Sequence, residues 1–279
     1  MSVKFFGQYL LERGTISREA LLKALELQDT RNLRLGDYAV RRGYLTEAQS
    51  EQINRIQLTE DKRFGEIAKE KGLLTEEQIG ELLTLQQNDY LMLGEALLEV
   101  GPLDRQTLEA ELKNFKADQE KYLTDDVIFP PGVKEPSLLA IPIDLTAKML
   151  LRIAAVTSKI GEGERSERPP VARLISVAVD FSGGLTAKYL LSLSEDIARK
   201  VALPMLGEDP GDDHEAVIDS VRELCNVICG NSAAKLAQLG KAVEIGPPMM
   251  VEGPLPAHEQ AILFPLHVAD GAAEVRILR

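Results

Sequence analysis

Apolar positions and glycines recur every 29 residues over the first 115 residues of the chain. In each copy a glycine follows a large apolar residue, a second glycine comes seven residues later, and a helix-capping residue follows three positions after that. The first glycines are Gly7, Gly36, Gly65 and Gly94, the second are Gly14, Gly43, Gly72 and Gly101, and the capping residues are Ser17, Thr46, Thr75 and Asp104. The pattern predicts four copies of one structural unit that share a core, because one short unit cannot bury its own apolar face.

Each copy predicts an αα-hairpin of about 24 residues. The first helix should end at the second glycine, because glycine readily adopts the left-handed conformation that closes a helix. The second helix should start at the capping residue, and Gln49 and Gln78 complete capping boxes in two of the copies. The last position of the pattern, which we call the closing position, is a glutamine in three copies and an aromatic residue in the fourth. These residues are Gln28, Gln57, Gln86 and Phe115.

The 29-residue period stops after Phe115. Residues 116–137 are rich in charge and proline, which is typical of a linker. We therefore predict a repeat domain at 1–115 and a second domain at 138–279.

The second domain has the pattern of an α+β fold. Runs of apolar or alternating residues at 173–180 and 186–194 flank Ser182-Gly183-Gly184, which predicts a β-hairpin. A second hairpin is expected from two further runs, 260–268 and 273–278, with Asp270-Gly271 as the turn. Because hairpins join most of the strands, the sheet should be largely antiparallel and packed with long helices.

Helices of the second domain are predicted at 144–156, 195–205 and 215–239, the first of them capped by Asp144. Residues 161–170 are predicted as a polar loop, and a further strand is expected near Val243. The complete prediction is an α+β protein with an all-α domain of four αα-hairpin repeats in front of an antiparallel sheet domain.

The long helix at 215–239 has two different faces. At 100° per residue the apolar residues fall in one arc, which predicts the core-facing stripe Val217, Val221, Leu224 and Ile228. The opposite arc carries Asp219, Glu223, Asn226 and Gly230. Asparagine and glycine lower helix propensity there. Taken alone, this face is either ordinary solvated surface or a surface that a partner approaches closely.

Composition narrows the class of protein. The chain is 44% hydrophobic and 27% charged, which is typical of a globular protein. The net charge is −12, with 15 Lys and Arg against 20 Asp and Glu in residues 1–115 and 17 against 24 in the remainder. Neither half is basic, so no nucleic-acid polymer is expected as a partner. No apolar run approaches the roughly 20 residues of a membrane span, and the first residues lack a signal-peptide layout, so we expect a cytoplasmic protein.

The cysteines and histidines predict no metal site. Cys225 and Cys229 are the only cysteines, and the three histidines are scattered along the chain. A structural zinc site needs about four ligands. We expect the two thiols to be buried and reduced.

The segment Asp219-Ser-Val-Arg-Glu223-Leu-Cys-Asn226 resembles the Asp/Ser-x3-Glu-x2-Asn motif of the CheC, CheX and FliY chemotaxis phosphatases. Pro247 and Pro248 stand within one or two residues of the place where the family has a later proline. The order of elements over residues 138–279 is similar to CheX, and a single motif helix favours the CheX arrangement over that of CheC. This resemblance covers the second predicted domain.

The resemblance implies a phosphatase that hydrolyses the aspartyl phosphate of a CheY-type response-regulator receiver. Asn226 would orient the attacking water, Glu223 would pair with the receiver's lysine, and Asp219 and Gly230 would contribute to docking. No intrinsic cofactor is implied, because Mg2+ is expected on the phosphorylated receiver. The resemblance also implies a homodimer.

The repeats, over about residues 4–115, resemble the N-terminal domain of secretion and pilus ATPases of the GspE and MshE kind, whose tandem motifs can bind cyclic di-GMP. Arg34, Gly36, Arg63 and Gly65 are the candidate nucleotide-binding residues. The second copy departs from the family pattern at Ser50 and Asn54, and the third at Ala68 and Lys69. Two interpretations stay open: a docking or spacer module, or a nucleotide-binding module. The alternative function is a non-catalytic scaffold that binds a receiver and cyclic di-GMP.

Overall fold

A computed structural model describes residues 5–119, 127–167, 174–251 and 261–279 of the chain. By its internal contacts the chain divides into two compact units. The first unit comprises Met1–Gln57 and Lys62–Leu123, and the second comprises Leu58–Asp61 and Thr124–Arg279. Each unit is described by itself below.

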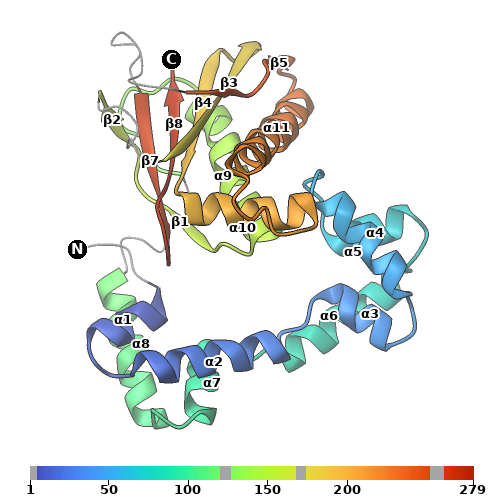
Figure 1. The fold of residues 1–279 in the computed structure, drawn as a ribbon, viewed down its shortest axis with the longest axis vertical. Helices are drawn as coiled ribbons and strands as arrows, with labels where there is room; N and C mark the ends of the chain where they lie inside the picture. The colour runs from blue at the N-terminus through green and yellow to red at the C-terminus, as the bar shows by residue number, and fades with distance from the viewer. Residues whose placement is uncertain (1–4, 120–126, 168–173, 252–260) are drawn as a thin grey trace. The chain divides into compact units, whose positions relative to one another are not determined.

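The first unit consists of four helical hairpins, as the repeat predicts (Figure 1). Their helices are α1 (Phe6–Glu12) and α2 (Arg18–Arg31), α3 (Leu35–Arg41) and α4 (Glu47–Gln57), α5 (Phe64–Glu70) and α6 (Glu76–Asp89), and α7 (Leu93–Glu99) and α8 (Arg105–Gln119). The second glycine of every copy has a φ angle between 66° and 85°, so each closes its first helix in the left-handed conformation. The capping boxes of Thr46 with Gln49 and of Thr75 with Gln78 are also formed.

The hairpins pair in a way that the repeat does not reveal. The first packs with the fourth, because α1 contacts α8 and α2 contacts α7, and the second packs with the third, because α3 contacts α6 and α4 contacts α5. The unit therefore has two separate apolar cores. One is centred on Leu10 and Leu97, and the other on Ile53, Ile67 and Leu82.

The closing glutamines connect the paired hairpins. Gln57 Nε2 donates to the carbonyl of Lys62 at 3.0 Å, and Gln86 Nε2 donates to the carbonyl of Leu33 at 2.9 Å. Gln28 Nε2 donates to the carbonyl of Leu91 at 2.8 Å. All three acceptors stand at the same position, just before the first helix of the paired hairpin. The recurring glutamine thus donates to a backbone carbonyl at this junction in three of the copies, and Asn32 Nδ2 also donates to the carbonyl of Leu91, at 3.0 Å.

The first glycine of each copy lets the two helices of its hairpin approach closely. A Cβ atom built at Gly65 would lie 3.0 Å from Cγ2 of Ile79, and one built at Gly94 would lie 3.1 Å from Cδ1 of Leu108. Each contact residue stands 14 positions after its glycine. Packing between helices therefore explains the first set of glycines.

We expect Gly65→Ala to lower the free energy of unfolding of the first unit by about 1–3 kcal/mol, because the added methyl group overpacks the contact with Ile79. Gly80→Ala is the matched control. Gly80 lies inside α6, and apart from the backbone of its own helix no described atom lies within 4 Å of the position that an added methyl group would occupy, so alanine there should stabilise by about 1 kcal/mol. Urea denaturation followed by circular dichroism measures both. Equal stabilisation by the two substitutions would contradict the close approach.

The second unit is an antiparallel sheet with three long helices (Figure 1). Its helices are α9 (Pro136–Ala154), α10 (Glu195–Leu206) and α11 (His214–Gln238). Its strands are β1 (Ser158–Ile160), β2 (Glu164–Ser166), β3 (Ile175–Gly183), β4 (Ala187–Leu193), β5 (Val243–Ile245), β6 (Met249–Met250), β7 (Ala261–Val268) and β8 (Ala273–Leu278). The strand order is β1-β7-β8-β4-β3-β5, with β2 beside β7 and β6 beside β3.

The main core lies between the helices and one face of this sheet. Val177, Val179 and Phe181 of β3 belong to it, together with buried residues of α9, α10 and α11. Alternate residues of the strands, such as Ala178 and Leu190, form a small separate cluster. This alternation is the period-2 pattern of a sheet in which successive side chains point to opposite faces.

Both predicted hairpins are confirmed. β3 pairs with β4 and β7 pairs with β8, both antiparallel, and Gly271 in the second turn has a φ angle of 94°. The helices predicted at 195–205 and 215–239 correspond to α10 and α11. The strand expected near Val243 is β5.

Two local predictions were wrong. The helix expected at 144–156 with Asp144 as its cap begins at Pro136 and ends at Ala154, and Asp144 lies inside it in an ion pair with Lys148. Proline is favoured at the first position of a helix, and burial of Leu139 and Ile143 offsets the hydrogen bond lost at Pro142. The loop expected at 161–170 contains β2, which pairs with β7, while residues 168–173 lie outside the described residues.

Candidate functional site

Helix α11 positions the candidate site, and its two faces are those that the sequence predicts. Val217, Val221, Leu224 and Ile228 are all fully buried in the main core. Asp213 caps the helix by accepting a hydrogen bond at 3.0 Å from the backbone N–H of Ala216. A capped helix of 25 residues with one face in the core is a rigid support for side chains on its other face.

Glu223 and Asn226 lie together on the exposed face of α11. They are three residues apart, which places them on neighbouring turns, and Asn226 Nδ2 lies 3.5 Å from Glu223 Oε2. This contact is at the long limit of a hydrogen bond. It engages one amide hydrogen and one carboxylate oxygen, so the Asn226 carbonyl oxygen and the second Glu223 oxygen still have the capacity to bind a partner.

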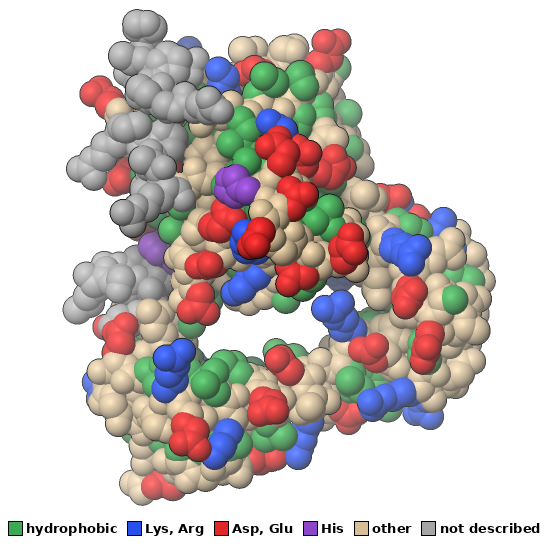
Figure 2. Space-filling view, in the orientation of Figure 1, with side chains coloured by type: hydrophobic (Ala, Val, Ile, Leu, Met, Phe, Trp, Pro, Cys, Tyr) green, Lys and Arg blue, Asp and Glu red, His purple; other side chains and the backbone are tan. Residues whose placement is uncertain are grey.

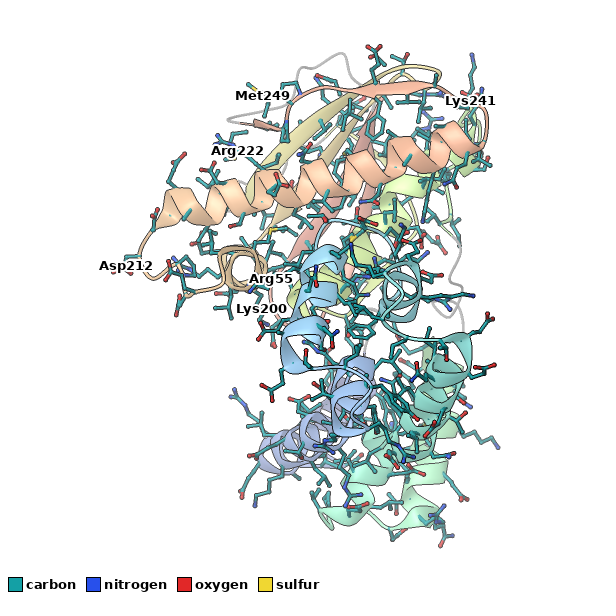
Figure 3. The ribbon with its side chains drawn as sticks, turned by 90° about the vertical axis from the view of Figure 1, so that its right-hand side faces the viewer. Arg55, Lys200, Asp212, Arg222, Lys241 and Met249 are labelled. Carbon is teal, nitrogen blue, oxygen red and sulfur yellow. The ribbon has the colours of Figure 1, made fainter. Side chains whose placement is uncertain are left out.

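Asp219 lies one turn before Glu223 and is also exposed. It forms an ion pair with Arg222, whose Nη1 lies 2.7 Å from Asp219 Oδ1. The same Nη1 lies 3.7 Å from Glu215 Oε1. Figure 3 shows Arg222 above α11, on the side of the helix toward Met249. Exposed ion pairs contribute little to stability, so this pair mainly orients Arg222 beside the two motif residues. The sequence interpretation did not single out Arg222, although its spacing from Asp219 is a known signal for a helical ion pair.

Gly230 stands one turn beyond Asn226 and is half-buried. A Cβ atom built there would meet no described atom within 4 Å. Packing among the described residues therefore does not require a glycine at this position, in contrast to the first glycines of the repeats. The bare backbone leaves room beside Asn226.

Asn231 is fixed by three hydrogen bonds within the second unit. Its Nδ2 donates to the carbonyls of Val227 at 2.8 Å and Thr59 at 3.0 Å, and its Oδ1 accepts from the backbone N–H of Asp61 at 3.0 Å. Burial raises the pKa of Asp61, but Lys235 and Arg152 outweigh it and lower that pKa overall. These contacts could not be read from the sequence, because the segment Leu58–Asp61 is distant from α11 along the chain.

The two cysteines of α11 have no role in this site. Cys225 and Cys229 point into the core, and burial raises the pKa of both thiols, so both stay protonated at neutral pH. The expectation that both thiols are buried is confirmed, and the two cysteines form no disulfide with each other. Among the described residues, no group of three His, Cys, Asp or Glu side chains could hold a metal ion, and no helix is long and apolar enough to span a membrane.

The candidate nucleotide-binding residues lie in the first unit. Arg34 and Arg63 are exposed at the N-cap positions of α3 and α5, where their backbone N–H groups donate to Asp37 and Glu66. Gly36 and Gly65 are buried in the helix contacts described above. The structure thus explains these glycines by packing, and nucleotide binding stays a prediction.

Comparison with known proteins identifies the class of the second unit. Residues 175–266 match the family model of the chemotaxis phosphatase CheX. The CheY-P phosphatase CheX of Thermotoga maritima is 28% identical over 102 residues, which is 36% of this chain and 66% of that relative, just under two thirds of its length. Residues 175–266 of the second unit are therefore similar to CheX, and the resemblance that the motif on α11 indicates is confirmed.

Solved structures of related proteins cover about half of the chain. CheX from Desulfovibrio desulfuricans is 20% identical and covers 51% of this chain and 99% of its own, with a TM-score of 0.45. A CheX-CheY-BeF3-Mg2+ complex from Borrelia burgdorferi matches at 22% identity over 50% of this chain and 96% of its own, with a TM-score of 0.42. FliY from Thermotoga maritima matches at 16% identity over 51% of this chain and 85% of its own, with a TM-score of 0.38. The resemblance of the repeats to the GspE and MshE domain stays a prediction.

Proposed function

We propose that this protein is a phosphatase that hydrolyses the aspartyl phosphate of a CheY-type receiver domain. The observation that carries the proposal is the exposed pair Glu223 and Asn226 on α11, which lies within the residues that match the CheX family. The chain would act without a cofactor of its own. A Mg2+ ion on the receiver would neutralise part of the charge on the phosphoryl group.

Asn226 is proposed to position the attacking water. The oxygen of that water forms a bond to phosphorus while the bond from phosphorus to the receiver's aspartate breaks, which releases a carboxylate, inorganic phosphate and a proton. An asparagine amide cannot take up the proton, but its carbonyl oxygen can accept a hydrogen bond from the water, and its neutral charge does not repel the phosphoryl oxygens. Its contribution is therefore orientation for in-line attack.

Glu223 is proposed to dock the receiver by pairing with the lysine beside its phosphorylation site. A hydrogen-bonded pair of a carboxylate and an ammonium group fixes both distance and orientation. Acidic side chains gather over α10 and α11 on the face drawn in Figure 2, and they would add to the attraction for a cationic group. Asp219 and Gly230 flank the pair on the same face and are proposed to contact the receiver, Gly230 by leaving room for its backbone.

We expect Glu223→Lys to raise the KM for the phosphorylated receiver about 10- to 100-fold, because a charge-assisted hydrogen bond is replaced by repulsion between two cations. Glu208→Lys makes the same charge change at an exposed position in the loop before α11 and is the control. Steady-state rates at several receiver concentrations measure KM. A similar rise in both variants would mean that net charge, and not the pair with the lysine, governs docking.

The function itself is tested by phosphate release. The full chain is added in substoichiometric amount to purified CheY-type receivers phosphorylated by a small phosphodonor with Mg2+, and CheX of Thermotoga maritima with its own CheY serves as the positive control. Release of many phosphates per chain supports the proposal. Absence of any acceleration across the receivers, or binding without turnover, would contradict it, and the latter result would favour the receiver-binding scaffold.

A further inference from the structure

The second repeat of the first unit departs from the other three at two positions on its second helix. In the other copies these positions hold the apolar pairs Leu21 and Leu25, Ile79 and Leu83, and Leu108 and Leu112. In the second repeat they hold Ser50 and Asn54. Since the first residue of each pair packs against the first glycine of its copy, smaller side chains at this place remove apolar volume from the hairpin.

A groove of about 520 Å³ lies at this place. It is formed by α3, α4 and Leu33, which stands two residues before α3, and its lining residues are Leu33, Asp37, Val40, Arg41, Glu47, Ser50, Glu51 and Asn54. Its volume is within the usual range of about 300–1,000 Å³ for small-molecule sites. The substitution of Ser50 and Asn54 for the apolar pair therefore coincides with an open groove whose volume lies in this range.

Ser50, one of the lining residues, brings a hydroxyl group to the groove. Ser50 is only 7% exposed, and within the described part of the chain its hydroxyl has no hydrogen-bond partner. The buried hydroxyls of Ser220 and Ser232 instead donate to the carbonyls four residues before them, at 2.8 and 2.7 Å. Within the described residues the Ser50 oxygen is not one of the fully buried oxygens that lack a partner, so it is accessible from the groove and can bind a ligand there.

The rim of the groove is acidic. Three carboxylates, those of Asp37, Glu47 and Glu51, line it together with one guanidinium group, that of Arg41. Asp37 Oδ2 accepts a hydrogen bond from the backbone N–H of Arg34. Glu51 Oε2 lies 3.9 Å from Arg55 Nη2. The excess of carboxylates favours a cation and disfavours an anionic ligand such as a nucleotide.

The carboxylates are spread along the groove. Over the residues that the structure describes, no three acidic, histidine or cysteine side chains converge as metal ligands do. Leu33 and Val40 add apolar surface between the polar groups. This combination suits an extended organic cation, whose methylene groups contact the apolar side chains while its charged ends reach separate carboxylates.

We propose that this groove binds an aliphatic polyamine. Its ammonium groups pair with Glu47 and Glu51, and its amines donate to the Ser50 hydroxyl and the Asn54 carbonyl oxygen. A peptide segment of a partner protein is less suited, because a standard protein interface needs about 800 Å² on each partner and this groove has eight lining residues. The proposal concerns the first unit and does not depend on the phosphatase activity.

Isothermal titration of the full chain with spermidine tests the proposal, at about 0.15 M salt so that non-specific attraction to the acidic surface is screened. We expect saturable binding to one site. Glu47→Gln, which keeps the shape of the side chain, should weaken binding about tenfold or more. Glu76→Gln is the matched control, because Glu76 stands at the same position in the third repeat, where Ile79 and Leu83 occupy the place of the groove.

Ser50→Leu combined with Asn54→Leu restores the apolar pair of the fourth repeat and should abolish binding, with circular dichroism reporting that the fold is kept. Absence of heat from the unmodified chain would overturn the proposal. So would equal weakening by Glu47→Gln and Glu76→Gln, which would indicate attraction to net charge alone. Binding of an arginine-rich peptide without binding of spermidine would also overturn it and would assign the groove to a protein partner.

Discussion

Asn226→Ala is expected to lower the rate of phosphate release from the receiver by about 100-fold or more, because a water molecule that is not oriented for in-line attack reacts far more slowly. Asn226 is exposed on α11, and among the described residues its side chain forms a hydrogen bond with Glu223 only. The free energy of unfolding should therefore stay within about 0.5 kcal/mol of the unmodified chain. Release of inorganic phosphate at saturating receiver measures the rate, and urea denaturation measures the stability.

Gln238→Ala is the matched control for this prediction. It also removes an exposed side-chain amide from α11, but at the end of the helix and away from the motif. We expect it to leave the rate unchanged. A loss of rate with Gln238→Ala as large as that with Asn226→Ala would show that the measurement reports the state of the helix and not the role of Asn226.

In contrast to Asn226→Ala, Leu224→Ala should lower the free energy of unfolding. Leu224 lies between the two motif residues in sequence but faces the core and is fully buried. Truncating a buried leucine removes apolar contacts and leaves a cavity, so we expect a loss of about 2–5 kcal/mol in the free energy of unfolding. Urea denaturation of the full chain, followed by circular dichroism, measures the change.

Leu239→Ala provides the control for this loss. Leu239 is at the C-terminal end of α11 and 62% exposed, so its truncation should cost less than about 0.5 kcal/mol. Comparable destabilisation by Leu224→Ala and Leu239→Ala would contradict the assignment of the two faces of α11. Together with Asn226→Ala, the series separates the contribution of this helix to folding from its contribution to chemistry.

The local features of the fold were predictable because local chemistry determines them. The four hairpins follow from a glycine at a positive φ angle and a capping residue three positions later, and the β-hairpins follow from their turn residues. The pairing of the hairpins was not predictable. All four copies present similar apolar faces, so the sequence does not distinguish a partner next along the chain from one further away.

Tertiary packing overrides local signals where the predictions failed. The start of α9 contains prolines that are typical of a linker, yet Leu139 and Ile143 are fully buried and hold the segment as a helix. The short strand β2 lies in a polar stretch and is recognisable only through its pairing with β7. Both depend on residues distant in sequence.

The candidate site was easier to predict than its surroundings. Glu223 and Asn226 lie on one helix three residues apart, so a motif in the sequence already places them on the same face. The contacts of Asn231 with Thr59 and Asp61 join distant segments, and no periodic pattern indicates them. Ser50 and Asn54 were predictable only in part. The sequence shows that they depart from the repeat, but only the structure shows the groove that they line.

The most direct test of the proposed role of Asn226 measures binding and hydrolysis on the same two proteins. The unmodified chain and Asn226→Ala are each titrated with a CheY-type receiver that carries beryllofluoride and Mg2+ as a stable phosphoryl mimic, and each is assayed for phosphate release from the phosphorylated receiver. We predict equal affinities for the mimic and a kcat about 100-fold lower for the variant, because Asn226 orients water and does not dock the receiver. Equal kcat values for the two proteins would contradict this role.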